Sequence, residues 1–157
     1  MSAVKFVVTL TNHPEQLGLL HRRLEQFGRA HNLPAKMMFQ LNLALEELFT
    51  NIVSYGYADQ AEHTIQIHLA MEKGSLIVRV EDDGVPFNPD QAQSPDLKCP
   101  LEERQIGGLG VHFIKKFMDK MVYERRNGKN ILIMKRTIGD HQSRGKRPHN
   151  PRKTNGR

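Results

Sequence analysis

The chain has little cysteine and no long apolar run, and each shortage excludes a class of protein. Cys99 is the single cysteine among 157 residues, so neither an intramolecular disulfide nor a zinc site built from several cysteines can form. The eight histidines show no metal-ligand spacing. No stretch approaches the roughly 18 consecutive apolar residues of a membrane span, and the first residues lack the apolar segment of a secretion signal. We therefore expect a cytoplasmic domain that does not contact membranes.

The main part of the chain also lacks a surplus of charge. The formal net charge is +6, but residues 141–157 contain six cations and no acid, whereas the first 140 residues contain 17 charges of each sign. We expect a folded domain over residues 1–136 and a basic, disordered tail over 137–157. The folded domain is not expected to bind nucleic acid, and binding of nucleic acid through the tail is a minor alternative.

Hydrophobic periodicity predicts the order of the secondary-structure elements. Helices are expected over residues 13–32, 35–54 and 109–120, and strands over 5–10, 63–71, 76–82, 121–126 and 130–136. Asn127-Gly128 indicates a type I′ hairpin between the last two strands. The order predicts an α+β fold, a two-layer sandwich with helices on one face of a mixed, mostly antiparallel sheet.

Residues 84–108 form a long segment between the third strand and the third helix. They contain four of the chain's eight prolines and few apolar residues. A loop of this length inside a compact domain is usually functional or disordered. We interpret it as a mobile lid.

Glu47 and Asn51 lie one helical turn apart in the expected second helix. Side chains at this spacing share a face, here beside the apolar stripe, while Glu46 lies about 100° away on the other side. A carboxylate and an amide oxygen suit a hard cation such as Mg²⁺. The same spacing is common on solvated helix faces, so taken alone it leaves a surface role open.

Asp82 and Gly84 end the third strand. Strand parity places Asp82 on the apolar face of residues 76, 78 and 80, and Asp83 on the opposite face. A carboxylate that ends an apolar row needs a partner, and the exocyclic amine of a purine is one candidate. Gly84 would let the backbone approach a flat ring. Asp-Asp-Gly is also a common surface turn, so this motif alone is weak.

A glycine-rich segment opens the third helix, and it consists of Gly107, Gly108, Leu109 and Gly110. Backbone N–H groups and the positive end of a helix dipole favour phosphate at such a position. The segment is neither a Walker A motif nor a Rossmann fingerprint. A flexible loop that caps the helix is the alternative.

The order of these motifs is more specific than any one of them. Glu47-x-x-x-Asn51, Asp82-x-Gly84 and Gly107-Gly-Leu-Gly110 resemble the N box and the two glycine boxes of the Bergerat-fold (GHKL) ATPases, from about residue 3 to 136. Three longer stretches resemble the anti-sigma-factor serine kinases of bacterial partner-switching systems in sequence: ALEELFTNIVSYGY, VEDDGVPFNP and GGLGVHFIKKFMDKMVYERRNGKN.

The resemblance implies a role for each motif residue. Glu47 would be the general base, Asn51 would hold Mg²⁺ across the ATP phosphates, and Asp82 would accept a hydrogen bond from the adenine amine. Gly84 would support the ring. The phosphates would be contacted by the glycine-rich segment and by a lid cation, namely by Gly107, Gly108, Leu109, Gly110 and Arg104. Such proteins often carry a Thr near adenine on the last strand, where this chain has Leu132.

The resemblance also implies a function. The chain would be an ATP- and Mg²⁺-dependent protein-serine/threonine kinase that phosphorylates a STAS-domain antagonist (an anti-anti-sigma factor). It would also sequester a sigma factor or another regulator, and members of this family often form homodimers. A non-enzymatic switch that binds ATP and a partner stays open, because Glu47 and Asn51 would serve both functions.

Overall fold

The computed structural model describes residues 6–87 and 108–138. The helices are α1 (Leu17–Ala30), α2 (Ala35–Tyr55) and α3 (Gly108–Phe117), and a short 3₁₀ turn (Pro14–Gln16) precedes α1. The strands are β1 (Phe6–Thr11), β2 (Thr64–Glu72), β3 (Ser75–Asp82), β4 (Lys120–Arg126) and β5 (Lys129–Thr137). None of the helices in this described part is long and apolar enough to cross a membrane.

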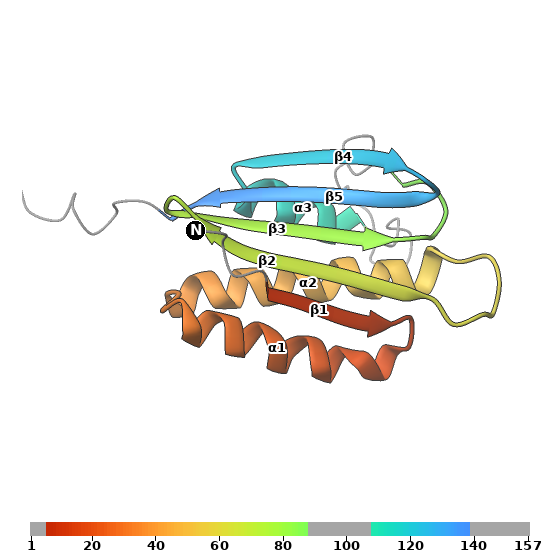
Figure 1. Ribbon diagram of the computed structural model, residues 1–157, viewed down its shortest axis with the longest axis horizontal. Coiled ribbons are helices and arrows are strands. Elements are labelled where there is room, and N and C mark those ends of the chain that lie inside the picture. The colour runs from red at the N-terminus through yellow and green to blue at the C-terminus, as the bar shows by residue number, and fades with distance from the viewer. Residues whose placement is uncertain (1–5, 88–107, 139–157) are drawn as a thin grey trace, which may run out of the picture.

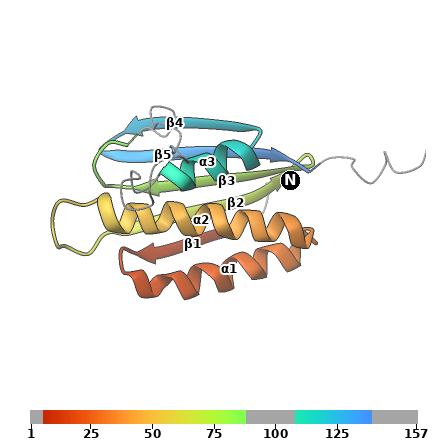
Figure 2. The ribbon, with the colours of Figure 1, turned by 180° about the vertical axis from the view of Figure 1, so that it is seen from behind.

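The five strands form one sheet in the order β1-β2-β3-β5-β4, and every pairing between them is antiparallel. The helices lie together on one face of this sheet (Figures 1 and 2). The predicted two-layer α+β sandwich is confirmed, but the sheet is not mixed. The connection through α3 does make β4 run in the same direction as β3, but β5 inserts between them by pairing antiparallel with both.

The core lies between the sheet and the helices. The inward row of β2 is buried at Ile65, Ile67 and Leu69, and β3 adds residues 76, 78 and 80. The helices add buried Leu24 and Phe27 from α1 and a longer apolar stripe from α2. Burial of such rows at about 25 cal/mol per Å² supplies the main driving force for folding, and it fixes which side chains of each strand face the helices.

Two tight turns set the register of the hairpins. Asn127 and Gly128 have φ angles of 53° and 73°, and Lys73 and Gly74 have 48° and 78°. Two consecutive positive φ values define the type I′ turn, whose twist matches that of antiparallel strands. The hairpin predicted from Asn127-Gly128 is therefore confirmed.

The third helix ends at Phe117, three residues earlier than predicted. The chain leaves the helix because the Asp119 amide donates to the Lys135 carbonyl (2.8 Å), and the Asp119 carboxylate accepts from the Thr137 amide (2.6 Å). These bonds draw the chain into the sheet at Lys120. At the far end, the Ile138 amide donates to the Gly74 carbonyl (2.8 Å), and the rest of the predicted tail lies outside the described residues.

Candidate functional site

A cavity of about 130 Å³ opens between the C-terminal half of α2 and the ends of β3 and β5. The C-terminal end of α2, the N-terminal end of α3 and the C-terminal end of β3 lie at the same end of the molecule (Figure 1). The walls are mostly aliphatic and aromatic, and Asn51, Asp82 and Asn130 add two amides and a carboxylate. The remaining lining residues are Leu48, Ile52, Tyr55, Gly56, Val80, Val85, Phe87, Tyr123 and Leu132. An apolar cleft with a few convergent polar groups is the usual form of a small-molecule site.

Asp82 is the buried acid of this cavity, with 7% of its surface exposed. Its Oδ1 accepts hydrogen bonds from the Gly84 amide (2.9 Å) and from the Asn130 side-chain amide (3.0 Å). Burial raises the pKa of Asp82, and these two hydrogen bonds together with the charge of Arg125 partly oppose that rise. The predicted parity is confirmed, because the neighbouring Asp83 side chain points away and is 46% exposed.

Gly84 joins the end of β3 to the end of α2. A Cβ at this position would lie 2.4 Å from the Gly56 carbonyl oxygen and 2.9 Å from Asp82 Oδ1. The adjacent Val85 amide donates to the same Gly56 carbonyl (2.7 Å), and Arg125 donates to the Gly84 carbonyl (2.7 Å). The close approach that excludes a side chain at Gly84 is therefore an approach to the end of α2.

Glu46 lies on a different side of α2 from Glu47 and Asn51, as predicted. Asn51 lines the cavity, and the half-buried Glu47 lies one turn earlier on the same helix. Glu46 turns to the other side, where its carboxylate lies 3.3 Å from the His21 ring of α1. The structure thus brings Asn51 and Asp82 to one cavity from elements that are far apart in the sequence.

The glycine-rich segment is described only in part. Gly108 is the first residue of α3, and Leu109 and Gly110 lie in its first turn, so the segment opens a helix as predicted. Gly107 and Arg104 lie outside the described residues, and so does Cys99.

Asn130 was missed by reasoning from the sequence. The strand register places Asn130 opposite Asp82, and it places Leu132 opposite Val80. Leu132 does line the cavity, but Asn130 is the polar β5 residue in contact with the buried acid. An Asn two residues after an Asn-Gly turn looks like part of the hairpin, and the pairing of β5 with β3 cannot be read from periodicity.

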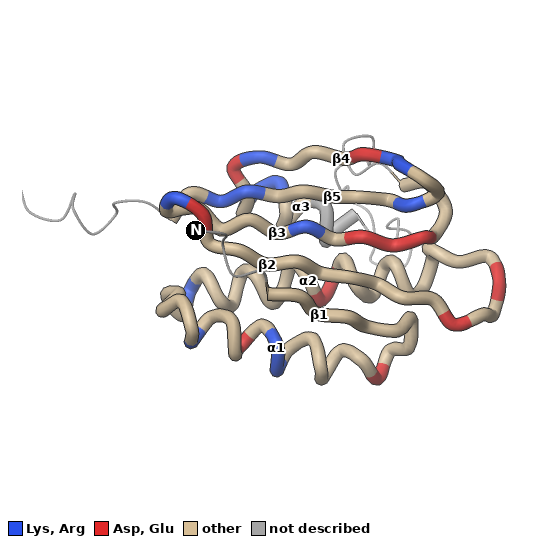
Figure 3. The backbone as a smooth tube through the Cα atoms, viewed as in Figure 1, with Lys and Arg blue, Asp and Glu red and all other residues tan. Residues whose placement is uncertain are grey.

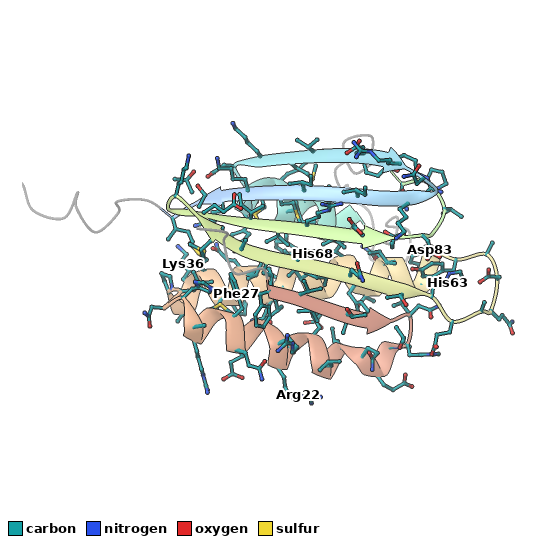
Figure 4. The ribbon with its side chains drawn as sticks, in the orientation of Figure 1. Arg22, Phe27, Lys36, His63, His68 and Asp83 are labelled. Atoms are coloured by element: carbon teal, nitrogen blue, oxygen red, sulfur yellow. The ribbon has the colours of Figure 1, made fainter. Side chains whose placement is uncertain are left out.

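A second group of charges lies beside the cavity, on the outer side of the β3 end. Nε2 of His63 lies 2.6 Å from Asp59, and its Nδ1 lies 3.1 Å from Asp83. The ring also stacks on Tyr57, with centroids 4.1 Å apart. Figure 4 shows His63 and Asp83 close together at this end of the molecule. These contacts give His63 a structural role at the surface.

These contacts change the pKa values in the cluster. Both ring nitrogens of His63 face carboxylate oxygens, so the hydrogen bonds to Asp59 and then Asp83 raise the pKa of His63. The same contact lowers the pKa of Asp59. Burial, followed by the neighbouring carboxylates, raises the pKa of Tyr57. Compared with the isolated side chains, the cluster therefore favours the charged imidazolium of His63 and the neutral phenol of Tyr57.

The cavity, its buried acid and the two-layer fold agree with the sequence family of the chain. Residues 10–136 match the family described as the histidine kinase-like ATPase domain, and the chain belongs to this family, the GHKL ATPases. A solved blue-light activated histidine kinase from Erythrobacter litoralis shares the fold, with a TM-score of 0.51 and 19% identity over 70% of this chain. This chain spans 33% of the length of that kinase.

Within the family, the chain belongs to the group of anti-sigma factors and serine-protein kinases. It is 31% identical to the serine/threonine-protein kinase BtrW of Bordetella bronchiseptica, over 71% of this chain and 78% of that protein. It is 24% identical to the serine-protein kinase RsbW of Bacillus subtilis, over 81% of this chain and 82% of that protein. It is 30% identical to the anti-sigma F factor of Bacillus cereus, over 62% of this chain and 72% of that protein. The predicted kinase class is confirmed at this level, and the family implies that the chain binds ATP.

Proposed function

We propose that this protein is a kinase that transfers the γ-phosphoryl group of ATP to a serine hydroxyl of a small STAS-domain antagonist. The observation that carries the proposal is the placing of a buried acid, Asp82, and a polar helix residue, Asn51, on the same apolar cavity. A nucleotide needs a polar group beside its base and another beside its phosphates. Asp82 and Asn51 would supply these two groups within the length of one nucleotide.

The adenine end of the site would be formed by Asp82 and the apolar walls. The Gly84 amide and the Asn130 side chain both donate to Oδ1 of Asp82, and Oδ2 would accept the hydrogen bond from the exocyclic amine. Leu132 and Val80 would cover the faces of the ring. This carboxylate and its apolar surroundings fit adenine, because a buried carboxylate is stabilised by an N–H donor of the ligand and destabilised by a second acceptor.

The phosphate end would be formed by α2 and the start of α3. Asn51 and Glu47 offer the oxygen ligands that Mg²⁺ prefers, and within residues 6–87 and 108–138 no group of three His, Cys, Asp or Glu side chains is placed to hold a metal. An ion here would therefore take most of its ligands from phosphate oxygens and water, which is how Mg²⁺ is commonly bound in nucleotide sites. The backbone at Gly108 and Gly110 would supply N–H groups to the phosphates.

Glu47 would act as the general base in the transfer. It would take the proton of the serine hydroxyl as the serine oxygen bonds to the γ-phosphorus and the bond to the bridging oxygen of ADP breaks. Catalysis of this step depends mainly on positioning and on neutralising the triphosphate charge. Arg104 is proposed to contribute to that neutralisation from outside the described residues.

A sigma factor or a comparable regulator is proposed as the second partner. The support is the similarity to a protein named as an anti-sigma factor and to the RsbW kinases. Exchange of this regulator for the STAS-domain protein would make the chain a switch between two partners.

Transfer from γ-labelled ATP to candidate STAS-domain proteins of the source genome tests the proposal. Wild type is expected to label one of them on serine, and Asn51→Ala and Glu47→Gln are expected to abolish labelling. Glu46→Gln is the matched control, because Glu46 faces His21 on the other side of the same helix. ATP binding without transfer to any STAS-domain protein would favour the non-enzymatic switch. Undiminished transfer by Asn51→Ala would contradict the metal assignment.

A further inference from the structure

Asn130 uses every hydrogen-bonding group of its side chain inside the site. Nδ2 donates to Asp82 Oδ1 (3.0 Å) and to the Val85 carbonyl (2.8 Å), and Oδ1 accepts from the Tyr123 hydroxyl (2.5 Å) and the Phe87 amide (3.2 Å). A side-chain amide has two N–H donors and two acceptor positions, so all four are occupied. Asn130 is also buried, with 6% of its surface exposed.

These contacts permit only one orientation of the amide. If the nitrogen and oxygen of Asn130 were exchanged, its oxygen would face Asp82 Oδ1 and the Val85 carbonyl, which are both acceptors. Buried acceptors that face each other without a proton are costly. The amide therefore presents a fixed N–H to the buried carboxylate.

The fixed N–H determines which oxygen of Asp82 faces the cavity. The Gly84 amide and Asn130 hold Oδ1 from two directions, one from the turn after β3 and one from the neighbouring strand β5. The Gly84 amide alone would fix the distance of Oδ1 but would leave the carboxylate free to rotate. With both donors in place, Oδ2 is directed away from them.

We propose that Asn130 is the positioning residue that orients Asp82, and that it thereby sets the preference of the site for adenine over a 6-oxo purine. The inference rests on the proposed nucleotide site. Because its own groups are all in use, Asn130 acts on the base through Asp82 and does not contact the base itself. Hypoxanthine and guanine carry an oxygen where adenine carries its amine, and that oxygen would face the oriented Oδ2.

Binding of ATP and of inosine triphosphate to the intact chain tests this role. Wild type is expected to bind ATP more tightly, and Asn130→Ala is expected to weaken ATP by about tenfold while inosine triphosphate changes little. The ratio of the two dissociation constants should therefore fall. Asn130→Asp keeps the shape but replaces the donor by an acceptor beside Asp82, so it should lower the ratio further.

Two controls separate positioning from loss of stability. Met134→Ala removes a fully buried side chain of the same strand that does not line the cavity, so it should lower the melting temperature without changing the ratio. Tyr123→Phe removes one donor to Asn130 Oδ1 but leaves the bond to Asp82, so it should change the ratio less than Asn130→Ala.

The outcomes are distinguishable. If wild type binds neither nucleotide, the proposed function is wrong. If wild type prefers ATP and Asn130→Ala keeps the same ratio, or weakens both nucleotides equally, the positioning role of Asn130 is wrong while the nucleotide site stands. A lower ratio in Asn130→Ala but not in Met134→Ala supports the role.

Discussion

Asp82 and Asp83 are neighbours in the sequence but belong to two different regions of the molecule. Asp82 faces the helices, is buried in the cavity and has a raised pKa. Asp83 faces the outside and pairs with His63, whose pKa is raised by its carboxylate partners. Figure 3 shows acidic residues gathered at this end of β3, with basic residues on the adjacent ends of β4 and β5. One step along a strand thus separates a carboxylate suited to ligand binding from one suited to stabilising a surface cluster.

The largest expected effect distinguishes the two carboxylates directly. In Asp82→Asn the side-chain oxygen can still accept from Gly84 and Asn130, which turns the new NH₂ toward the cavity and the adenine amine. We expect ATP affinity to fall about a hundredfold, measured by calorimetric titration. Stability at neutral pH should be unchanged or higher, because burial of a charge is removed.

Asp83→Asn is the matched variant of this pair. It should leave ATP affinity unchanged and lower stability, because it removes a charged partner of His63. Equal losses of ATP affinity in both variants would contradict the separation of the two regions.

Gly84→Ala tests the contact that holds the cavity wall against α2. The added Cβ would lie within 3 Å of the Gly56 carbonyl and of Asp82 Oδ1, so we expect a loss of about 1–3 kcal/mol in the free energy of unfolding and weaker ATP binding. Chemical denaturation followed by circular dichroism measures the first effect.

Gly18→Ala provides the control for the glycine substitution. Gly18 lies in α1 near only the flexible end of Arg22, at 3.7 Å from the Cβ position. It should gain up to about 1 kcal/mol from higher helix propensity. A stable Gly84→Ala variant with wild-type affinity would show that the close contact at Gly56 is not needed.

The outer cluster should make stability depend on pH. The pKa of His63 is raised in the folded state, so protonated His63 stabilises the fold. This stabilisation is fully present below about pH 6.5, the ordinary pKa of histidine, and is lost as the pH rises through the folded-state pKa. Asp59 has a lowered pKa, so its contribution is lost as the pH falls below its ordinary value. His63→Gln should flatten the decline on the alkaline side in urea titrations between pH 6 and pH 9. An unchanged slope would rule out His63 as the titrating group.

The smallest expected effect concerns the basic residues that follow the sheet. Ile138 makes the last described backbone hydrogen bond, to Gly74, and a truncation after Ile138 keeps every residue that the structure places in either region. We expect ATP affinity and the melting temperature to stay within measurement error, with affinity changing by less than about twofold. A marked loss of ATP binding on truncation would assign the tail a role at the site.

Much of the fold could be predicted from the sequence because the signals are local. Alternation placed Asp82 on the apolar face and Asp83 on the other, and Asn127-Gly128 indicated its hairpin from two residues. Helical spacing separated Asn51 from Glu46. The purely antiparallel sheet was not predicted, because the insertion of β5 between β3 and β4 depends on a pairing between distant segments.

The residue types of the site and the faces on which they lie could be read from the chain alone, because side-chain direction follows from the period of each helix or strand. The contacts of these residues depend on how distant segments pack together. The register between β3 and β5 brought Asn130 to Asp82, and the packing of α2 against the end of β3 made Gly84 necessary. Such contacts cannot be read from a local pattern, because hydrogen bonds and close packing depend on distances between segments that are set only when the core forms.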